Sequence, residues 1–206
     1  MSVSTLSNVS PTPDLRNDLA LIASWIPQGS RVLDLGCGDG DLLAYLKAKK
    51  ACEGYGVEID DVQLLACMKR GVSVIQRNIE DGLELFGQKQ FDVVVLSMAI
   101  QATKRTENVL REICEVGREA IVSFPNFGHW SHAWSILMGR MPVSREMPYQ
   151  WYDTPNLHLS TPRDFEILAN RLGLVIVQKA LLKEGREIRG LAGMRATQAI
   201  YRLRLR

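Results

Sequence analysis

Apolar positions in the first 125 residues alternate between two spacings, which predicts alternating strands and helices. Short apolar runs typical of buried strands occupy residues 31–35, 54–59, 72–76, 91–96 and 119–125. Between these runs, apolar residues recur at helical spacing over residues 14–26, 41–50, 61–70 and 106–116, and one short helix is expected within residues 78–90. The run 91–96 is apolar enough to be buried on both faces, as a parallel strand requires. The alternation predicts a mostly parallel sheet with helices on both faces.

The last part of the chain carries a different pattern. Thr161, Pro162 and Asp164 are typical of a helix start, and Gly173 is expected to end that helix. Residues 174–182 and 197–205 have the character of two strands, joined by a basic segment that contains glycine. We expect them to close the sheet as an antiparallel hairpin, which makes seven strands in all.

Residues 126–160 show no clear period, yet they hold a cluster of aromatic side chains. A segment of this length without regular structure is a candidate functional loop. Three interpretations stay open: a lid over a ligand, a protein interface, or packing on the sheet. The residues expected to serve as partner contacts or lid are Trp130, Arg140, Tyr149, Trp151 and Tyr152. His129, His132 and His158 are candidate general bases, although a structural role suits a histidine in an aromatic segment better.

Composition narrows the class of protein. The chain has 206 residues and a formal net charge of +2, which fits one α/β domain over residues 14–206 and gives no reason to expect nucleic acid or an anionic membrane as partner. The four cysteines lack metal-ligand spacing, so we expect reduced thiols, no metal and a cytoplasmic location. Residues 1–13, rich in Ser, Thr and Pro, are expected to form a disordered tail, and no apolar run is long enough to span a membrane.

The chemistry-bearing motif is a glycine-rich loop between the first strand and the next helix. Gly36, Gly38 and Gly40 let the backbone turn sharply and let a ligand approach the main chain. The third glycine follows the second by two residues, not the three of a dinucleotide fingerprint, and Asp34 precedes the loop. This variant resembles motif I of Rossmann-like methyltransferases, which hold S-adenosylmethionine (SAM). The alternative is a plain strand-to-helix turn.

A second acidic residue supports this interpretation. Glu58 ends the second predicted strand, 22 residues after Gly36, where a carboxylate is expected to accept bonds from ribose hydroxyls. An acid at a solvated strand end is the alternative. By resemblance to the wider fold, the candidate cofactor-binding residues are Asp34, Gly36, Cys37, Gly38, Gly40, Glu58, Ile59, Asn78, Ile79 and Leu96. Asn78 stands where an aspartate often meets the adenine amino group, and Leu96 is expected to border the methionine half of SAM or of its product, S-adenosylhomocysteine.

A more specific resemblance covers roughly residues 14–182. The motifs that carry it are Phe124-Pro-Asn-Phe-Gly-His-Trp130, Gly139-Arg-Met-Pro-Val-Ser144, Met147-Pro-Tyr-Gln-Trp-Tyr-Asp-Thr-Pro-Asn-Leu-His158, Leu15-Arg-Asn-Asp18 and Trp25-Ile-Pro27. The chain resembles the MetW family of methionine-biosynthesis proteins. The resemblance implies a Rossmann-like class I methyltransferase fold and a SAM-binding protein that acts with the homoserine O-acyltransferase MetX.

Catalytic residues are not evident from the sequence. The segment after the fourth strand, Ser97-Met-Ala-Ile-Gln101, lacks the acceptor motifs of amino or cytosine methyltransferases. Chiefly on the family resemblance, we favour an accessory, SAM-responsive partner of MetX over a methyltransferase acting on a small metabolite. An RNA methyltransferase is the weakest hypothesis, because the basic residues near the carboxyl end are typical of a solvated strand face.

Overall fold

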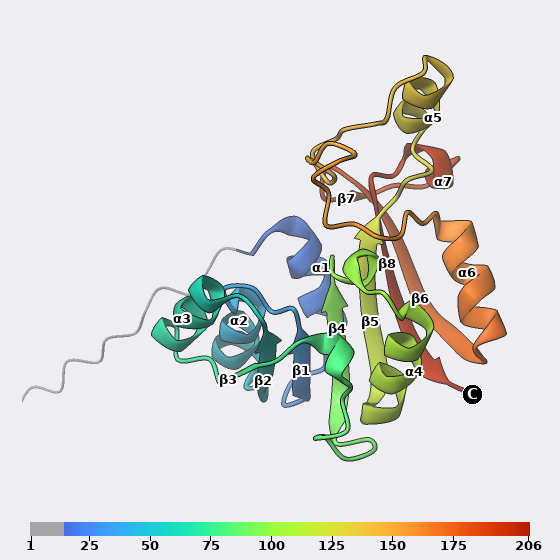
Figure 1. The fold of residues 1–206 in the computed structure, drawn as a ribbon. Coiled ribbons are helices and arrows are strands. Elements are labelled where there is room, and N and C mark those ends of the chain that lie inside the picture. Colours follow the sequence, from blue (N-terminus) through green and yellow to red (C-terminus); the bar gives the residue numbers. More distant parts are fainter. Residues whose placement is uncertain (1–14) are drawn as a thin grey trace, which may run out of the picture.

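The computed structural model describes residues 15–206. Their strands form one mixed sheet with the order β3-β2-β1-β4-β5-β8-β6-β7 (Figure 1). The strands are β1 Arg31–Leu35, β2 Glu53–Glu58, β3 Val74–Gln76, β4 Phe91–Ser97, β5 Gly117–Pro125, β6 Leu174–Lys183, β7 Arg186–Glu187 and β8 Gln198–Leu205. The helices are α1 Asn17–Trp25, α2 Asp41–Lys50, α3 Asp61–Lys69, α4 Thr106–Val116, α5 Trp130–Leu137, α6 Pro162–Arg171 and α7 Ala192–Arg195. Short 3₁₀ turns occupy Ile79–Asp81 and Ile100–Ala102.

The strand pairing follows the expected methyltransferase arrangement. β1 to β5 are parallel, and β8 runs antiparallel to both β5 and β6. The predicted fold class, with its antiparallel hairpin at the end of the chain, is confirmed. The expected count of seven strands is wrong by one, because the basic connector between β6 and β8 contains the two-residue strand β7.

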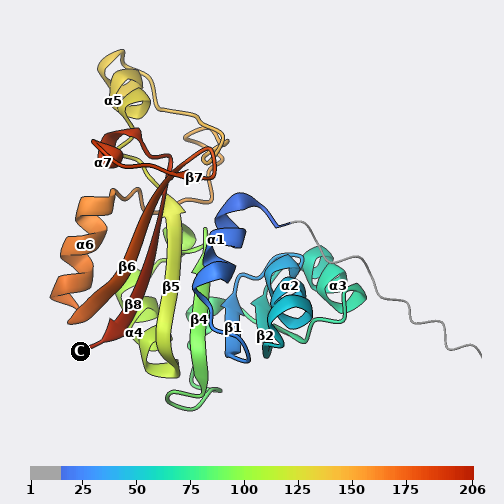
Figure 2. The same cartoon turned by 180° about the vertical axis from the view of Figure 1, so that it is seen from behind.

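Helices lie on both faces of the sheet, as Figures 1 and 2 show from opposite sides, and a hydrophobic layer fills the space on each face. Side chains of α1, α2 and α3 pack with Val93 and Val95 on one face. Side chains of α4 and α6 pack with Val94 and Leu96 on the other. The alternation within β4 explains why its sequence is apolar throughout.

The local start and stop signals act as the sequence predicts. Thr161 Oγ1 accepts the backbone N–H of Asp164, with Pro162 in the first turn of α6. Gly71 and Gly173 follow the ends of α3 and α6 with φ of +69° and +74°, the conformation that closes a helix. The predicted tail, residues 1–13, lies outside the described residues. Between residues 15 and 206, no helix has the length and apolarity needed to span a bilayer.

The segment after β5 projects beyond the carboxyl end of the sheet in both views. We call residues 129–157 the aromatic lobe. The lobe contains α5, which the sequence pattern does not predict, because apolar side chains on the exposed side of this helix leave no polar stripe. Its root is fixed by Asn126, a fully buried residue whose Nδ2 donates to the carbonyl oxygens of Gly193 and Ala196, both at 2.8 Å.

Candidate functional site

The glycine loop joins β1 to α2 at the carboxyl end of the sheet, where ligands of open α/β sheets bind. Gly36, Gly38 and Gly40 have φ of +69°, +55° and +80°, in the left-handed region that favours glycine. The glycines differ in surroundings. A Cβ on Gly38 would meet no atom within 4 Å, whereas a Cβ on Gly40 would lie 3.0 Å from Cys67 Sγ. Gly38 therefore faces open space, and Gly40 packs against α3.

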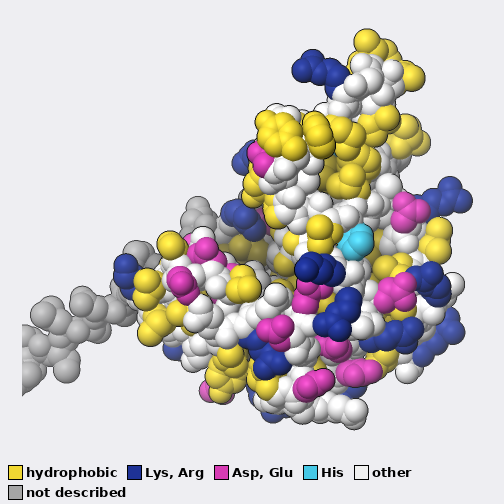
Figure 3. Space-filling model, in the orientation of Figure 1, with side chains coloured by type: hydrophobic (Ala, Val, Ile, Leu, Met, Phe, Trp, Pro, Cys, Tyr) yellow, Lys and Arg dark blue, Asp and Glu magenta, His cyan; other side chains and the backbone are white. Residues whose placement is uncertain are grey.

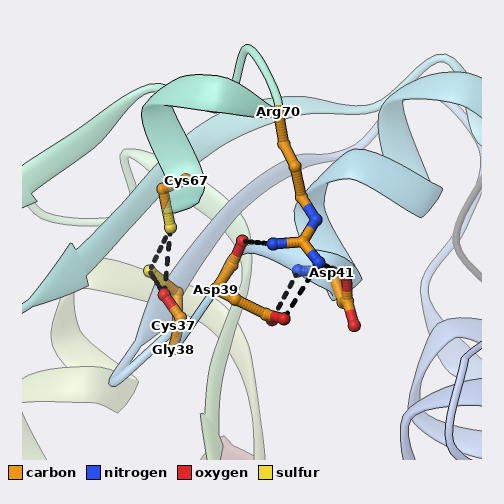
Figure 4. Close-up of polar contacts among 6 residues, drawn as sticks. All are labelled: Cys37, Gly38, Asp39, Asp41, Cys67 and Arg70. Atoms are coloured by element: carbon orange, nitrogen blue, oxygen red, sulfur yellow. Dashed lines mark hydrogen bonds and ion pairs between the residues drawn. The ribbon is translucent and has the colours of Figure 1, made fainter. Parts of the chain in front are cut away.

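A set of contacts from α3 and the residue after it holds the outer side of the loop (Figure 4). Arg70 Nη1 donates to the carbonyl oxygen of Asp39 at 2.9 Å, and Arg70 Nη2 lies 3.0 Å and 2.9 Å from the carboxylates of Asp39 and Asp41. Cys67 Sγ donates to the carbonyl oxygen of Gly38 at 3.0 Å and lies 3.7 Å from Cys37 Sγ. Burial raises the pKa of both thiols, so they stay protonated.

The inner side of the loop is tied to β2 by Glu58. Its Oε2 accepts the backbone N–H of Gly38 at 2.9 Å, and its Oε1 accepts those of Ile59 and Asp60 at 2.8 Å and 3.0 Å. A carboxylate accepts about four hydrogen bonds. Glu58 therefore keeps room for about one further donor without a change in the loop, rather than the two ribose hydroxyls that the sequence suggests.

Two cavities meet at Gly36, and most of the predicted cofactor residues line them. The Asp34 cavity, of about 450 Å³, is lined by Asp34, Gly36, Cys37 and Gly38 together with Arg16, Ser97 and Met98. The Glu58 cavity, of about 300 Å³, is lined by Gly36, Glu58, Ile59, Asn78 and Ile79 together with Arg77, Ala99 and Thr103. A wider cavity of about 660 Å³ lies at the amino ends of β1, β2 and β4, away from the glycine loop.

Two predicted residues, Leu96 and Gly40, line neither cavity, and a third, Asn78, is partly occupied by a bond within the chain. Leu96 lines neither cavity, because strand alternation buries its side chain with Val94 in the core, and the following Ser97 and Met98 line the Asp34 cavity instead. Gly40 packs against α3, as described above. Asn78 lines the Glu58 cavity, but its Oδ1 already accepts the backbone N–H of Glu80 at 2.9 Å, which leaves one acceptor position for another donor.

Asp34 gives the site its electrostatic character. Its side chain is nearly fully buried, and within residues 15–206 no hydrogen bond reaches its carboxylate. Burial, with a smaller contribution from the charge of Glu58, raises the pKa of Asp34 to about 7. A buried acid on the wall of a cavity, with no donor to it from the described part of the chain, suits a ligand that brings its own positive charge.

Sequence reasoning did not assign Arg16 or Arg77 to the site, since the motif Leu15-Arg-Asn-Asp18 indicated only the family and Arg77 lies in no recognisable motif. Arg16 directly precedes α1 and lines the Asp34 cavity, and Arg77 follows β3 and lines the Glu58 cavity. The three histidines lie elsewhere. His129 and His132 are buried at the base of the aromatic lobe, and His158 lines a cavity of about 720 Å³ beside α4 and α6.

The aromatic lobe does not line the two cavities that meet at Gly36. None of its residues contributes to the wall of either one. Trp130, Trp151 and Tyr152 are exposed by 55%, 71% and 71%, and Arg140 and Tyr149 are also exposed. Of the three interpretations that the sequence leaves open, this exposure argues against packing on the sheet.

Comparison with known proteins decides the family. The family described as "Methionine biosynthesis protein MetW" matches residues 16–203, nearly the whole of the described chain. The chain belongs to the MetW family. The resemblance seen in the sequence motifs is thereby confirmed.

Among curated proteins, this MetW chain is 38% identical over 172 residues to the "Bifunctional methionine biosynthesis protein MetXA/MetW" of Rhodopirellula baltica. The match covers 79% of this chain and 28% of that relative, so the chain spans little more than a quarter of the relative's length.

Among solved structures, the fold is similar to an S-adenosylmethionine-dependent methyltransferase from Mesorhizobium loti, with a TM-score of 0.69, 16% identity, and coverage of 91% and 97% of the two chains. It is also similar to the [4+2]-cyclase SpnF, with a TM-score of 0.65, 17% identity, and coverage of 91% and 80%. These likenesses establish the class I methyltransferase fold of this MetW chain.

Proposed function

We propose that this MetW protein binds SAM across the two cavities that meet at Gly36. The observation that carries the proposal is the pairing of Glu58 in one cavity with the buried Asp34, which no donor among residues 15–206 reaches, in the other. The adenosine half belongs in the Glu58 cavity, where Glu58 would accept one ribose hydroxyl and Asn78 the adenine amino group. The amino-acid half belongs in the Asp34 cavity.

The charges of the Asp34 cavity suit an amino acid. Asp34 would pair with the ligand's ammonium group, and the guanidinium of Arg16 would pair with its carboxylate. Asp39 and Asp41 also line this cavity. This acidic wall favours SAM, which carries a sulfonium charge, over S-adenosylhomocysteine, which does not.

We further propose that the protein acts together with the homoserine O-acyltransferase MetX and supports its activity. The relative from Rhodopirellula baltica, named as a MetXA/MetW bifunctional protein, supports this, because it joins the two units in one chain. SAM lies downstream of methionine, so a SAM-binding subunit could report the end-product level to an early enzyme. Such regulation requires that SAM bind the free and the MetX-bound states with different affinities.

Methyl transfer to a small metabolite is the second candidate function. Its supporting observation is that Ser97 and Met98 line the Asp34 cavity, at the end where a reactive methyl group would lie. The fold itself does not decide the question, since a protein described as a [4+2]-cyclase shares it.

Two measurements test the proposal. Titration calorimetry with SAM and with S-adenosylhomocysteine is expected to show binding of both, tighter for SAM. The activity of the cognate MetX, assayed with and without this protein and at increasing SAM, is expected to rise on addition of the protein and to change with SAM. SAM binding without any effect on MetX would favour the methyltransferase and would call for a screen of methyl acceptors.

A further inference from the structure

The aromatic lobe exposes more apolar surface than a solvated loop requires. Three of the four tryptophans of the chain lie in it, at positions 130, 134 and 151, and each is more than half exposed. Leu137 and Tyr152 are exposed by 75% and 71%. Figure 3 shows hydrophobic side chains gathered over the projecting part of the molecule. Contiguous apolar surface of this kind marks an interaction site.

A groove in the lobe gives this surface a shape. It has a volume of about 610 Å³ and lies between α5 and the segment that follows it. Met141, Val143 and Trp151 supply its apolar wall, and Arg140 is the charged residue among those that line it. Tryptophan and arginine dominate the energetic centres of protein interfaces. The groove therefore suits an apolar side chain of a partner with a carboxylate beside it.

Hydrogen bonds hold the lobe to neighbouring segments at both ends. At its start, the Asn126 amide fixes the chain to α7, and the N–H of Phe127 donates to the carbonyl oxygen of Ser160 at 3.0 Å. At its end, the N–H groups of Leu157 and His158 donate to the carbonyl oxygen of Gln101, at 2.8 Å and 3.0 Å. A surface fixed in this way loses little conformational freedom when a partner binds.

The second attachment also links the lobe to the proposed cofactor site. Gln101 belongs to the 3₁₀ turn Ile100–Ala102, and Ala102 of the same turn lines the Glu58 cavity. The lobe is thus separate from the cavities but attached to an element of their wall.

We propose that the aromatic lobe is the docking surface for MetX, with the groove at Arg140 and Trp151 as its centre. This inference rests on the proposed function, in which MetX is the partner. The fused relative favours MetX over a second copy of this chain, because it keeps a MetXA unit and a MetW unit at high effective concentration. Attachment to the 3₁₀ turn gives SAM a route to alter docking.

Binding of the full-length protein to the cognate MetX, measured by calorimetry, tests the proposal. We expect Trp151→Ala and Arg140→Glu each to raise the dissociation constant for MetX at least about tenfold, as substitutions at interface centres do. Met68→Ala on α3 and Ile167→Ala on α6 are matched controls, since both side chains are 61% exposed and lie outside the lobe. The controls are expected to bind MetX within about twofold of the parent protein, because neither side chain belongs to the proposed docking surface. All four variants should bind SAM as the parent does.

The alternative outcomes are distinct. If the parent protein binds MetX and the lobe variants bind equally well, the docking surface is placed wrongly while the proposed function stands. If the parent protein does not bind MetX at all, both the partnership and the docking surface are refuted. If the parent protein dimerises and Trp151→Ala makes it monomeric without affecting MetX binding, the lobe is a self-association surface, and the proposal is overturned.

Discussion

The Glu58 carboxylate accepts the backbone N–H of Gly38 at 2.9 Å and so ties the end of β2 to the loop that follows β1. The same carboxylate lines the cavity proposed for adenosine. Glu58 therefore has two roles, because it fixes the shape of the glycine loop and is also the proposed acceptor for ribose.

Removing this carboxylate should weaken SAM binding. We expect Glu58→Ala to lower affinity by about 10- to 100-fold, since a hydrogen bond to a charged group contributes about 1.5–3 kcal/mol. Calorimetry measures the affinity. Glu53→Ala, at the exposed start of β2, is the control and should bind as the parent does. Equal affinity in Glu58→Ala would show that ribose lies elsewhere.

Substitution of Gly38 and of Gly40 by alanine should lower the free energy of unfolding by different amounts. Gly38→Ala is expected to cost about 1–2 kcal/mol of stability from its left-handed backbone alone, because a Cβ there meets no neighbour. Gly40→Ala should cost more, because its Cβ would also press on Cys67 Sγ and on Val72, whose Cγ2 would be 3.2 Å away. Urea unfolding measures both free energies.

The control for backbone strain is Gly29→Ala, with φ of +72° and no neighbour within 4 Å of its Cβ. It should match Gly38→Ala in stability and keep full SAM affinity, whereas Gly38→Val should abolish SAM binding. A Gly38→Val protein that binds SAM normally would contradict the proposed approach of the ligand to this loop.

Asp34 should make the free energy of unfolding depend on pH. Its pKa is raised to about 7 in the folded protein, above the ordinary value of 3.8. Between these values the folded state holds a proton that the unfolded state releases, so stability should fall as pH rises from about 4 to about 7 and level off above. The loss is of the order of a few kcal/mol, at about 1.4 kcal/mol per pKa unit. Asp34→Asn should remove this slope, and Asp153→Asn, on an exposed residue, should retain it.

The same carboxyl group should make SAM binding depend on pH in the opposite direction. An ammonium group beside Asp34 favours the ionised acid. Below pH 7, binding should therefore release the proton of Asp34 and weaken as pH falls, whereas above pH 7 the acid is already ionised and no proton is released. Calorimetry between pH 5.5 and 8.5 would reveal this dependence, and Asp34→Asn should bind more weakly at high pH with a flatter profile. A parent protein with a flat profile would argue against the ammonium–Asp34 pair.

Tyr201 should be important for the stability of the sheet but not for the site. This fully buried residue of β8 donates its hydroxyl proton to Glu166 Oε1 at 2.9 Å, and its ring stacks on Phe124. Burial raises the pKa of Glu166, but hydrogen bonds from Lys179 and Tyr201 outweigh that effect and lower it. Tyr201→Phe should cost about 1–3 kcal/mol on unfolding, because a buried hydrogen bond is lost. Tyr149→Phe on the exposed lobe should cost nothing measurable, and SAM affinity should be unchanged in both.

Much of this architecture could be predicted because its signals are local. The three glycines, Glu58 and the Thr161 cap each need only their neighbours in the chain to be interpreted. β7 escaped prediction because two residues carry no period, and α5 because its exposed side is apolar.

The cavity walls required knowledge of tertiary structure. Leu96 and Ser97 are adjacent in sequence, and only the register of β4 in the sheet determines that Leu96 enters the core while Ser97 faces the cavity. Arg16 directly precedes α1 and lines the Asp34 cavity, although the motif that contains it gives no sign of a role in the site. The exposure of the aromatic lobe likewise depends on where β5 ends, since the same residues would suit a core.

The position of β8 has a consequence for how the protein is made. β8 lies between β5 and β6, although it follows both of them in the chain. A nascent chain emerging from the ribosome can assemble the parallel half as soon as β5 has appeared, but β6 and α6 have no place in the sheet until residues 198–205 emerge. Until then, the edge of β5 and the apolar face of α6 stay open to other chains, which is a hazard for incomplete sheets. Synthesis of the last strand is therefore the event that closes the fold.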